Sequence, residues 1–310
     1  MQLSLVVPSY NEEIVLPEMA ARLSTLLAQL VRVGTVVEAS RIYFIDDGSM
    51  DKTWAIIESL AKSNPAIKGI RLSRNCGHQI ALLAGLLTVP GDAVISVDAD
   101  LQDDLAAIEP MLDAHAQGSE IVFGVRRKRD TDTFTKRLTA TGYYHLLERL
   151  GVETVFNHAD YRLMGRRALS ALAEYAEVNV FLRGIIPQLG FRTSIVYYDR
   201  LERFAGESKY PLKKMLALAW NGVTSFTAAP LRAITVVGIS IAMISFGITL
   251  WALMMRIFTV STVPGWASTV VPIYLLGGLQ LFAIGLIGEY LAKTYMETKR
   301  RPRFFIQESV

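Results

Sequence analysis

The sequence predicts an α/β domain with a mostly parallel sheet, followed by two membrane-spanning helices. Short apolar or β-branched runs alternate with amphipathic stretches in the first two-thirds of the chain, and most of the last third is densely apolar. Strands that alternate with helices are typical of parallel sheets with helical crossovers. The expected strands are residues 3–7, 42–45, 67–72, 93–97 and 120–123, and the expected helices are residues 12–30, 52–62, 79–88 and 105–116.

Two stretches near the C-terminus, residues 233–255 and 267–288, contain no charged side chain. Each is long enough to cross a bilayer, because about 20 helical residues span its ~30 Å hydrocarbon core. We therefore expect a two-helix transmembrane hairpin with spans at about 233–255 and 267–289. A pair of buried helices in a large soluble core is the alternative interpretation.

Basic residues flank this hairpin unevenly. The connector between the spans carries only Arg256, whereas several lysines and arginines precede the first span and follow the second. The positive-inside rule then predicts a multi-pass protein of the inner (cell) membrane, with the N-terminal domain and both termini in the cytoplasm. The single cysteine, Cys76, excludes an internal disulfide and agrees with an intracellular domain.

These features predict four parts of the chain. They are a cytoplasmic α/β domain at 1–206, an interfacial helix region at 207–230, the two spans within 231–292, and a basic cytoplasmic tail at 293–310. Residues 210–226 mix lysines with leucine and tryptophan, a pattern typical of a helix that lies in the membrane interface. A second amphipathic stretch, 134–147, is expected either to lie on the membrane or to cover the core with a solvated face.

Polar motifs follow four of the expected strands. They are Pro8–Glu13, Asp46–Ser49, Arg74–His78 and Asp98–Gln102. The carboxyl ends of parallel strands meet at one edge of a sheet, and open α/β sheets bind their ligands there. We therefore expect the four motifs to form one site.

The motifs argue against two common classes of nucleotide-binding protein. The chain has no G-x-G-x-x-G fingerprint and no G-x-x-x-x-G-K-[ST] loop, which Rossmann dehydrogenases and P-loop NTPases would need. A net charge of +3 and the lack of a nucleic-acid-binding motif give no reason to expect DNA or RNA. Asp98, Asp100 and Gln102 instead offer hard oxygen ligands for a divalent cation that also binds diphosphate. Paired aspartates also form turns, so this motif alone is weak.

Together, the motifs resemble glycosyltransferase family 2 in order and spacing. Within that family the likeness is to the dolichol-phosphate mannose synthases and the bacterial polyprenyl-phosphate (bactoprenol) glucosyltransferases. Asp160–Met164, Arg203–Tyr210 and the C-terminal hairpin are similar to that subgroup too. The resemblance covers essentially the whole chain and implies a GT-A-type, Rossmann-like domain. Asp103 and Asp104 depart from it, since relatives often carry proline there, and this is expected to affect only the start of the next helix.

The resemblance implies roles on the side of a sugar donor. Asp98, Asp100 and Gln102 would hold Mg²⁺ or Mn²⁺ against the diphosphate of a nucleotide sugar, which makes Asp100 a catalytic residue. The residues that would bind the donor nucleotide are Pro8, Tyr10, Glu12, Asp46, Asp47 and Asp98. UDP-glucose is the first choice of donor by resemblance only, because sugar selectivity rests on a few pocket contacts that no motif identifies.

On the acceptor side, the resemblance implies polyprenyl phosphate, such as undecaprenyl phosphate. Arg203 would meet a phosphate group and act in catalysis, and Asp160 would lie near the reacting centre. The expected acceptor-phosphate ligands are Arg126, Arg127, Arg203, Ser208 and Lys209. A phosphomonoester, whose second pKa is about 6, is largely a dianion near neutral pH. Asp160 could therefore orient Arg162 or a sugar hydroxyl rather than act as an obligatory base. A structural cap is the alternative for Asp160.

The expected activity is inverting transfer of a hexose from a nucleotide diphosphate to polyprenyl phosphate, giving a lipid-linked sugar for cell-surface glycan modification. The resemblance also implies a homo-oligomer, with a tetramer as the expected form. Two alternatives stay open. One is a processive polysaccharide synthase, which would carry a Gln-x-x-Arg-Trp motif and more spans, and the other is a non-catalytic membrane scaffold that binds sugar nucleotides. His78 is expected to be a loop residue beside the donor site.

Overall fold

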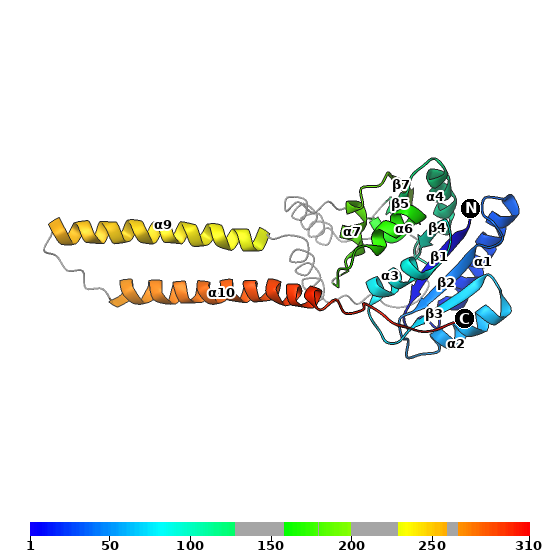
Figure 1. Cartoon of the computed structure of the whole chain (residues 1–310), viewed down its shortest axis with the longest axis horizontal. Coiled ribbons are helices and arrows are strands. Elements are labelled where there is room, and N and C mark those ends of the chain that lie inside the picture. The colour runs from blue at the N-terminus through cyan, green and yellow to red at the C-terminus, as the bar shows by residue number, and fades with distance from the viewer. Residues whose placement is uncertain (128–157, 179, 200–228, 259–265) are drawn as a thin grey trace. The chain divides into compact units, whose positions relative to one another are not determined.

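The computed structural model describes residues 1–127, 158–178, 180–199, 229–258 and 266–310 of the chain (Figure 1). The chain divides into two compact units, one made of residues 1–212 with 300–310 and the other of residues 213–299. The first unit contains a sheet covered by helices. The second contains two long helices.

Among the described residues, eight strands form one sheet in the order β7-β5-β6-β4-β1-β2-β3-β8. The strands are β1 (Leu3–Ser9), β2 (Arg41–Asp46), β3 (Ile67–Leu72), β4 (Ala93–Ser96), β5 (Ile121–Arg126), β6 (His158–Gly165), β7 (Thr193–Tyr198) and β8 (Ile306–Ser309). β1 runs parallel to β2 and β4, β2 to β3, and β5 to β7. β6 runs antiparallel between β4 and β5. The predicted α/β fold with a mostly parallel sheet is confirmed.

The helices of the first unit connect and cover these strands (Figure 1). They are α1 (Leu16–Val33), α2 (Thr53–Ser63), α3 (His78–Thr88), the 3-10 helix η1 (Leu105–Ala107), α4 (Ile108–Ala116), α6 (Arg166–Ala173) and α7 (Leu182–Gln188). The buried residues of α1 recur every three or four positions, so one face of the helix packs on the core. The helix ends at Gly34, whose left-handed backbone (φ 83°) suits glycine.

Helix α3 packs directly on the β1–β2 part of the sheet, and this packing depends on Gly85. A Cβ atom added to Gly85 would overlap the side chain of Val6 on β1 and would lie 3.0 Å from the side chain of Ile45 on β2. A residue without a side chain therefore lets the helix approach the sheet closely. The approach fixes the position of the first two residues of α3, His78 and Gln79.

The end of the chain belongs to the first unit. Strand β8 pairs with β3 in antiparallel orientation, and Arg71 of β3 forms an ion pair with Glu308 at 3.0 Å. The sequence pattern predicts a basic tail at 293–310 and no strand there. Most of the residues of β8 are exposed and show no apolar alternation, so the usual strand signal is missing.

The second unit contains α9 (Ala229–Phe258) and α10 (Trp266–Thr298), which lie side by side and run in opposite directions (Figure 1). The two helices include the predicted spans at 233–255 and 267–289. Within the part of the chain that the structure describes, no helix meets the length and apolar character that a membrane span requires. The transmembrane hairpin stays a prediction. The amphipathic stretch 134–147, and the interfacial region up to residue 228, lie outside the described residues.

Candidate functional site

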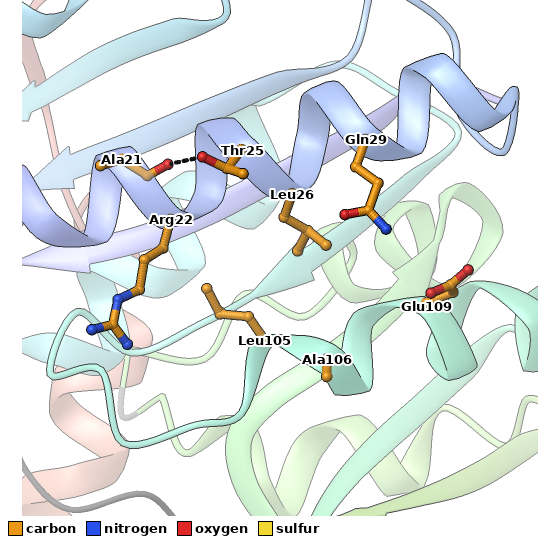
Figure 2. Close-up of a pocket in the computed structure, with 8 residues that line it drawn as sticks. All are labelled: Ala21, Arg22, Thr25, Leu26, Gln29, Leu105, Ala106 and Glu109. Atoms are coloured by element: carbon orange, nitrogen blue, oxygen red, sulfur yellow. Dashed lines mark hydrogen bonds between the residues drawn. The ribbon is translucent and has the colours of Figure 1, made fainter.

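One cavity lies away from the strand ends, between α1 and the η1–α4 segment (Figure 2). Its volume is about 500 Å³. The lining residues are Ala21, Arg22, Thr25, Leu26, Gln29, Leu105, Ala106 and Glu109. None of the predicted site residues is among them. The polar motifs at the strand ends are the better candidate.

The motifs that follow β1 and β2 are joined by hydrogen bonds. The backbone of Asn11 is left-handed (φ 54°), a conformation that asparagine adopts more readily than most residues. Its N–H donates to Ser49 Oγ at 3.0 Å, and its Oδ1 accepts from the N–H of Met50 at 2.9 Å. The N–H of Glu12 donates to Thr53 Oγ1 at 2.9 Å. These contacts fix the first two motifs against each other.

Asp46 and Asp47 end β2 as two buried carboxylates. Asp46 forms an ion pair with Arg71 at 3.3 Å, and burial raises the pKa of its carboxyl. Burial also raises the pKa of Asp47, although its hydrogen bonds oppose the shift. The two oxygens of Asp47 accept from the N–H groups of Cys76 (2.7 Å) and Gly77 (2.8 Å). Asp47 therefore holds the loop that leads into α3.

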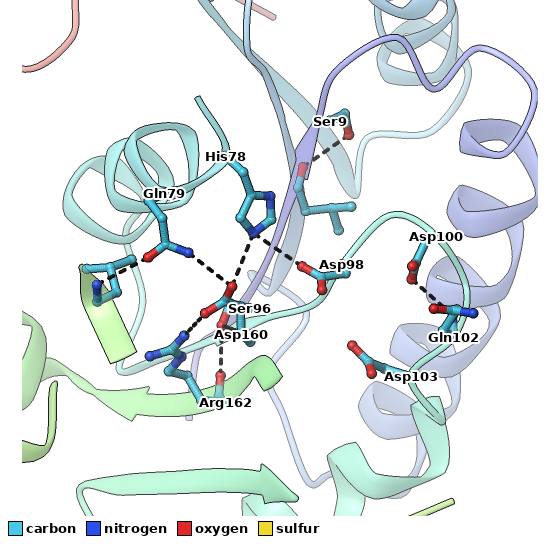
Figure 3. A network of polar contacts seen from close by, with 12 residues as sticks. Ser9, His78, Gln79, Ser96, Asp98, Asp100, Gln102, Asp103, Asp160 and Arg162 are labelled. Atoms are coloured by element: carbon cyan, nitrogen blue, oxygen red, sulfur yellow. Dashed lines mark hydrogen bonds and ion pairs between the residues drawn. The ribbon is translucent and has the colours of Figure 1, made fainter. Parts of the chain in front are cut away.

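Asp160 of β6 lies at the centre of a cluster of polar contacts and is only 3% exposed (Figure 3). Its Oδ2 accepts from Gln79 Nε2 at 3.1 Å and lies 3.4 Å from His78 Nε2. Arg183 donates from Nε to Oδ1 at 3.3 Å and from Nη2 to Oδ2 at 3.2 Å. Arg162 donates from Nη2 to Oδ1. Side chains from α3, β6 and α7 thus converge on one carboxylate.

The neighbours of Asp160 determine its ionisation. Burial alone would raise the pKa of this carboxyl, but His78, Arg162 and Arg183 hold it well below its usual range. Burial would in turn lower the pKa of His78, and the Asp160 and Asp98 carboxylates raise it instead. A carboxylate with so low a pKa is ionised at neutral pH and accepts a proton poorly. The cluster therefore favours an orienting role for Asp160 over that of a base.

Arg162 is completely buried, two residues along β6 from Asp160. Within the described part of the chain, its Nε and Nη1 atoms have no hydrogen-bond partner. Asp160 supplies the opposite charge. Removing one member of a buried ion pair is strongly destabilising, because the other charge is left without compensation. The stability of the domain is therefore expected to depend on having both Asp160 and Arg162.

The loop after β4 brings Asp98 to the same cluster. Asp98 Oδ1 lies 3.5 Å from His78 Nε2, so that His78 lies between Asp98 and Asp160 (Figure 3). Burial, with help from neighbouring carboxylates, raises the pKa of Asp98 to about 6. Asp100 Oδ1 accepts from the N–H of Gln102 at 3.2 Å, which closes a turn in the loop.

Asp103 anchors this loop to the rest of the domain. Its Oδ1 accepts from Arg126 Nη2 at 3.0 Å and from the Tyr198 hydroxyl at 2.5 Å. Tyr161 packs edge-on against Tyr198, with 5.2 Å between ring centroids, and donates to the carbonyl of Asp104 at 3.1 Å. The effect of Asp103 is thus wider than the predicted change at the start of a helix. The Arg126 guanidinium is engaged here, and its predicted role toward an acceptor stays a prediction.

The ligands of the Asp98–Gln102 loop suit a cation that arrives with its own oxygen ligands. Among the described residues, no three His, Cys, Asp or Glu side chains are gathered as a metal cluster. The loop offers two carboxylates, Asp98 and Asp100, and the amide of Gln102. Mg²⁺ is commonly held by one or two carboxylates together with substrate phosphates. The residues present therefore fit a divalent cation bound jointly with a diphosphate.

The structure brings part of the predicted site together. Asp98 and Asp160 meet through His78, and Asp47 supports the loop before His78. Pro8 is buried within β1, whereas Tyr10 is 41% exposed at the end of the strand. The predicted residues Arg203, Ser208 and Lys209 lie outside the described residues. Arg127 is exposed.

Two residues of the cluster, Gln79 and Arg183, were missed by the sequence analysis. Gln79 follows the Arg74–His78 motif directly and points in the same direction as His78 (Figure 3). Arg183 is the single charged residue of a short apolar helix, α7. A lone arginine in an apolar helix is a signal that could have identified Arg183, because a charge in such a place needs a partner. The partner, Asp160, precedes it by 23 residues.

Comparison with known proteins agrees with the geometry. The family model described as glycosyl transferase family 2 matches residues 4–173. The chain is 48% identical to an uncharacterized glycosyltransferase, YkoT, of Bacillus subtilis (strain 168), over 98% of this chain and 90% of the relative. It is 39% identical to the bactoprenol glucosyl transferase of Shigella phage SfX and 37% identical to the prophage bactoprenol glucosyl transferase homolog of Escherichia coli (strain K12). Both alignments cover 99% of each chain.

Proposed function

Given that the chain belongs to glycosyl transferase family 2, we propose that it transfers a hexose from a nucleotide-diphosphate sugar to polyprenyl phosphate, with inversion at the anomeric carbon. UDP-glucose and undecaprenyl phosphate are the first-choice substrates. The names of the phage and prophage relatives, both bactoprenol glucosyl transferases, support this choice, and they align with this chain over nearly its full length.

The observation that carries the proposal is the contact of His78 with both Asp98 and Asp160. It joins a loop with oxygen ligands to a cluster with two arginines. The loop suits a cation and the diphosphate of a donor, and the cluster suits an incoming anionic group. A reaction between a nucleotide sugar and a phosphate requires both environments next to each other.

On the donor side, Asp98, Asp100 and Gln102 would hold Mg²⁺ or Mn²⁺. Such an ion supplies electrostatic stabilisation for the charge that develops on the leaving diphosphate. Asp47 keeps the loop before His78 in place through two backbone hydrogen bonds. The residues proposed to bind the nucleotide are Pro8, Tyr10, Glu12, Asp46, Asp47 and Asp98.

On the acceptor side, the attacking group is a phosphate oxygen of the lipid. With a second pKa of about 6, this phosphate is largely a dianion near neutral pH and needs no strong base. The low pKa of Asp160 agrees with a reaction in which Asp160 orients cations instead of accepting a proton. The phosphate attacks C1 of the sugar, the bond from C1 to the diphosphate breaks, and the nucleoside diphosphate leaves with both electrons of that bond.

The proposal includes the membrane placement and the oligomeric state of the protein. We place α9 and α10 in the inner membrane as a hairpin, with the catalytic domain and both termini in the cytoplasm, where sugar nucleotides are made available. Arg127, Arg203, Ser208 and Lys209 are the residues proposed to receive the lipid phosphate. A homo-oligomer, with a tetramer as the expected form, completes the proposal.

A donor screen with purified full-length protein tests this function. The protein in detergent is mixed with undecaprenyl phosphate, Mg²⁺ and one radiolabelled nucleotide sugar at a time. We expect label from UDP-glucose to move into the organic phase only when the lipid phosphate is present. A polysaccharide synthase would instead give a water-soluble polymer without the lipid, and a non-catalytic scaffold would bind UDP-glucose without turnover. Either result would contradict the proposal.

A further inference from the structure

Two arginine side chains meet at the Asp160 carboxylate. The guanidinium groups of Arg162 and Arg183 each form an ion pair with Asp160. Gln79, which also donates to the carboxylate, is neutral. Asp98 faces the cluster across His78. Guanidinium groups suit a phosphate ligand, because they bind phosphate oxygens through charge-assisted hydrogen bonds.

Only some of the side chains around Asp160 are accessible to a ligand. The side chain of Arg162 is completely buried, whereas those of Arg183 and His78 are 37% and 46% exposed. Arg183 lies in the first turn of α7, and His78 is the first residue of α3. An anion that approaches the cluster therefore meets Arg183 and His78, and Arg162 acts on it only through Asp160.

Asp160 fixes the orientation of the Arg183 guanidinium. Two N–H groups, on Nε and Nη2, point at the two oxygens of the carboxylate, so the plane of the guanidinium is held from one side. Arginine binds carboxylates and phosphates through the same planar set of donors. A phosphate can therefore share this guanidinium with Asp160, and it meets a cation that is already oriented.

From these contacts we propose that Arg183 binds the phosphate group of the acceptor, that Asp160 is its positioning residue, and that His78 lies beside the bound phosphate. This inference rests on the proposed function and adds a residue to it. The acceptor phosphate has to reach a sugar whose diphosphate is held at the Asp98 loop, and His78 contacts both that loop and Asp160. The donor diphosphate has the same chemistry, so the experiment has to separate the two sources.

The test measures binding of each ligand separately. Citronellyl phosphate, a short prenyl phosphate, is titrated calorimetrically into the full-length protein in detergent with UDP and Mn²⁺, and UDP is titrated in a second series. We expect Arg183→Ala to weaken prenyl phosphate binding roughly tenfold or more, since a charge-assisted contact is lost, and to leave UDP affinity unchanged. Arg183→Lys should recover part of the affinity, because lysine lacks the planar fork.

Arg167→Ala is the matched control. Its side chain is 78% exposed on α6, and its ion pair with Glu120 is long at 3.6 Å. We expect this variant to bind both ligands like the wild type. Thermal unfolding verifies that each variant is folded. If the Arg183→Ala variant is unfolded, the inference is tested by Arg183→Lys alone, for which we expect a partial loss of affinity for citronellyl phosphate.

Two outcomes would overturn the inference. One is unchanged affinity for citronellyl phosphate in both Arg183 variants, and the other is a loss of UDP affinity alone, which would assign Arg183 to the donor. The proposed function fails in a different way. In that case the wild type binds the prenyl phosphate, with the expected dependence on Arg183, but transfers no sugar to it.

Discussion

Arg126 and Asp103 form an ion pair, with 3.0 Å between Nη2 and Oδ1, that ties the end of β5 to the loop after β4. Asp103 is fully buried at its side chain, and Arg126 is largely so. Tyr198 of β7 shares the same carboxylate oxygen. The loop that carries Asp98 and Asp100 is therefore held by contacts to two strands on the far side of β6.

Arg126→Ala tests whether this ion pair is structural. The substitution leaves the Asp103 carboxylate buried without its cation, so we expect the free energy of unfolding to fall by about 1–3 kcal/mol. Arg127→Ala, at the exposed neighbouring position, should stay within about 0.5 kcal/mol of the wild type. Chemical denaturation in detergent measures both. If Arg126→Ala is as stable as the wild type and its KM for the lipid phosphate is raised, Arg126 is an acceptor ligand instead.

Gly85→Ala tests the close packing of α3 on the sheet. The added Cβ would overlap the Val6 side chain, and overpacking of a well-packed core costs about 1–3 kcal/mol. The shift of α3 should also displace His78 and Gln79 and lower kcat. Adding Val6→Ala removes the side chain that the new Cβ would overlap. The double variant should therefore be more stable than the sum of the two single changes in unfolding free energy predicts. Additive effects would mean that Val6 does not limit the approach of the helix.

Asp100→Asn tests the cation. We expect EDTA to abolish transfer by the wild type and Mn²⁺ or Mg²⁺ to restore it, and the variant should lose most activity while staying folded. UDP binding gives a second readout: it should depend on Mn²⁺ in the wild type and lose that dependence in Asp100→Asn. Full activity of the variant with a chelator present would remove the cation from the mechanism.

Reporter fusions test the orientation of the hairpin. Fusions at Met1 and Val310 should report from the cytoplasmic side, and a fusion at Val260, between the two helices, should report from the opposite side. The basis is the excess of lysine and arginine before residue 233 and after residue 289. A cytoplasmic signal at Val260 would mean that the two helices do not cross the membrane.

The central part of the fold could be predicted because its signal is local. Strands β1 to β4 are short apolar runs, the helices between them have regular spacing, and the motifs at the strand ends follow directly. Parallel order then placed Asp46 and Asp98 at the same edge. These inferences need only nearby residues and the rule that parallel strands end together.

The remaining features depend on pairings that are distant in sequence. Strand β6 lies antiparallel between β4 and β5, and nothing in its own pattern fixes that place. The partner of Asp160 on α7, Arg183, and the partner of Asp103 on β5, Arg126, are separated from them by 23 residues each. An ion pair in three dimensions has no sequence spacing of its own, so single charged residues could not be assigned partners in advance.

The configuration of the product tests the central claim most directly. The wild-type protein is incubated with UDP-α-glucose and undecaprenyl phosphate, and the lipid fraction is examined by mass spectrometry and by NMR of the anomeric centre. We expect one glucose joined to the lipid through a phosphodiester, in the β configuration that a single displacement produces. An α-linked product, or free glucose with no lipid-linked sugar, would contradict it.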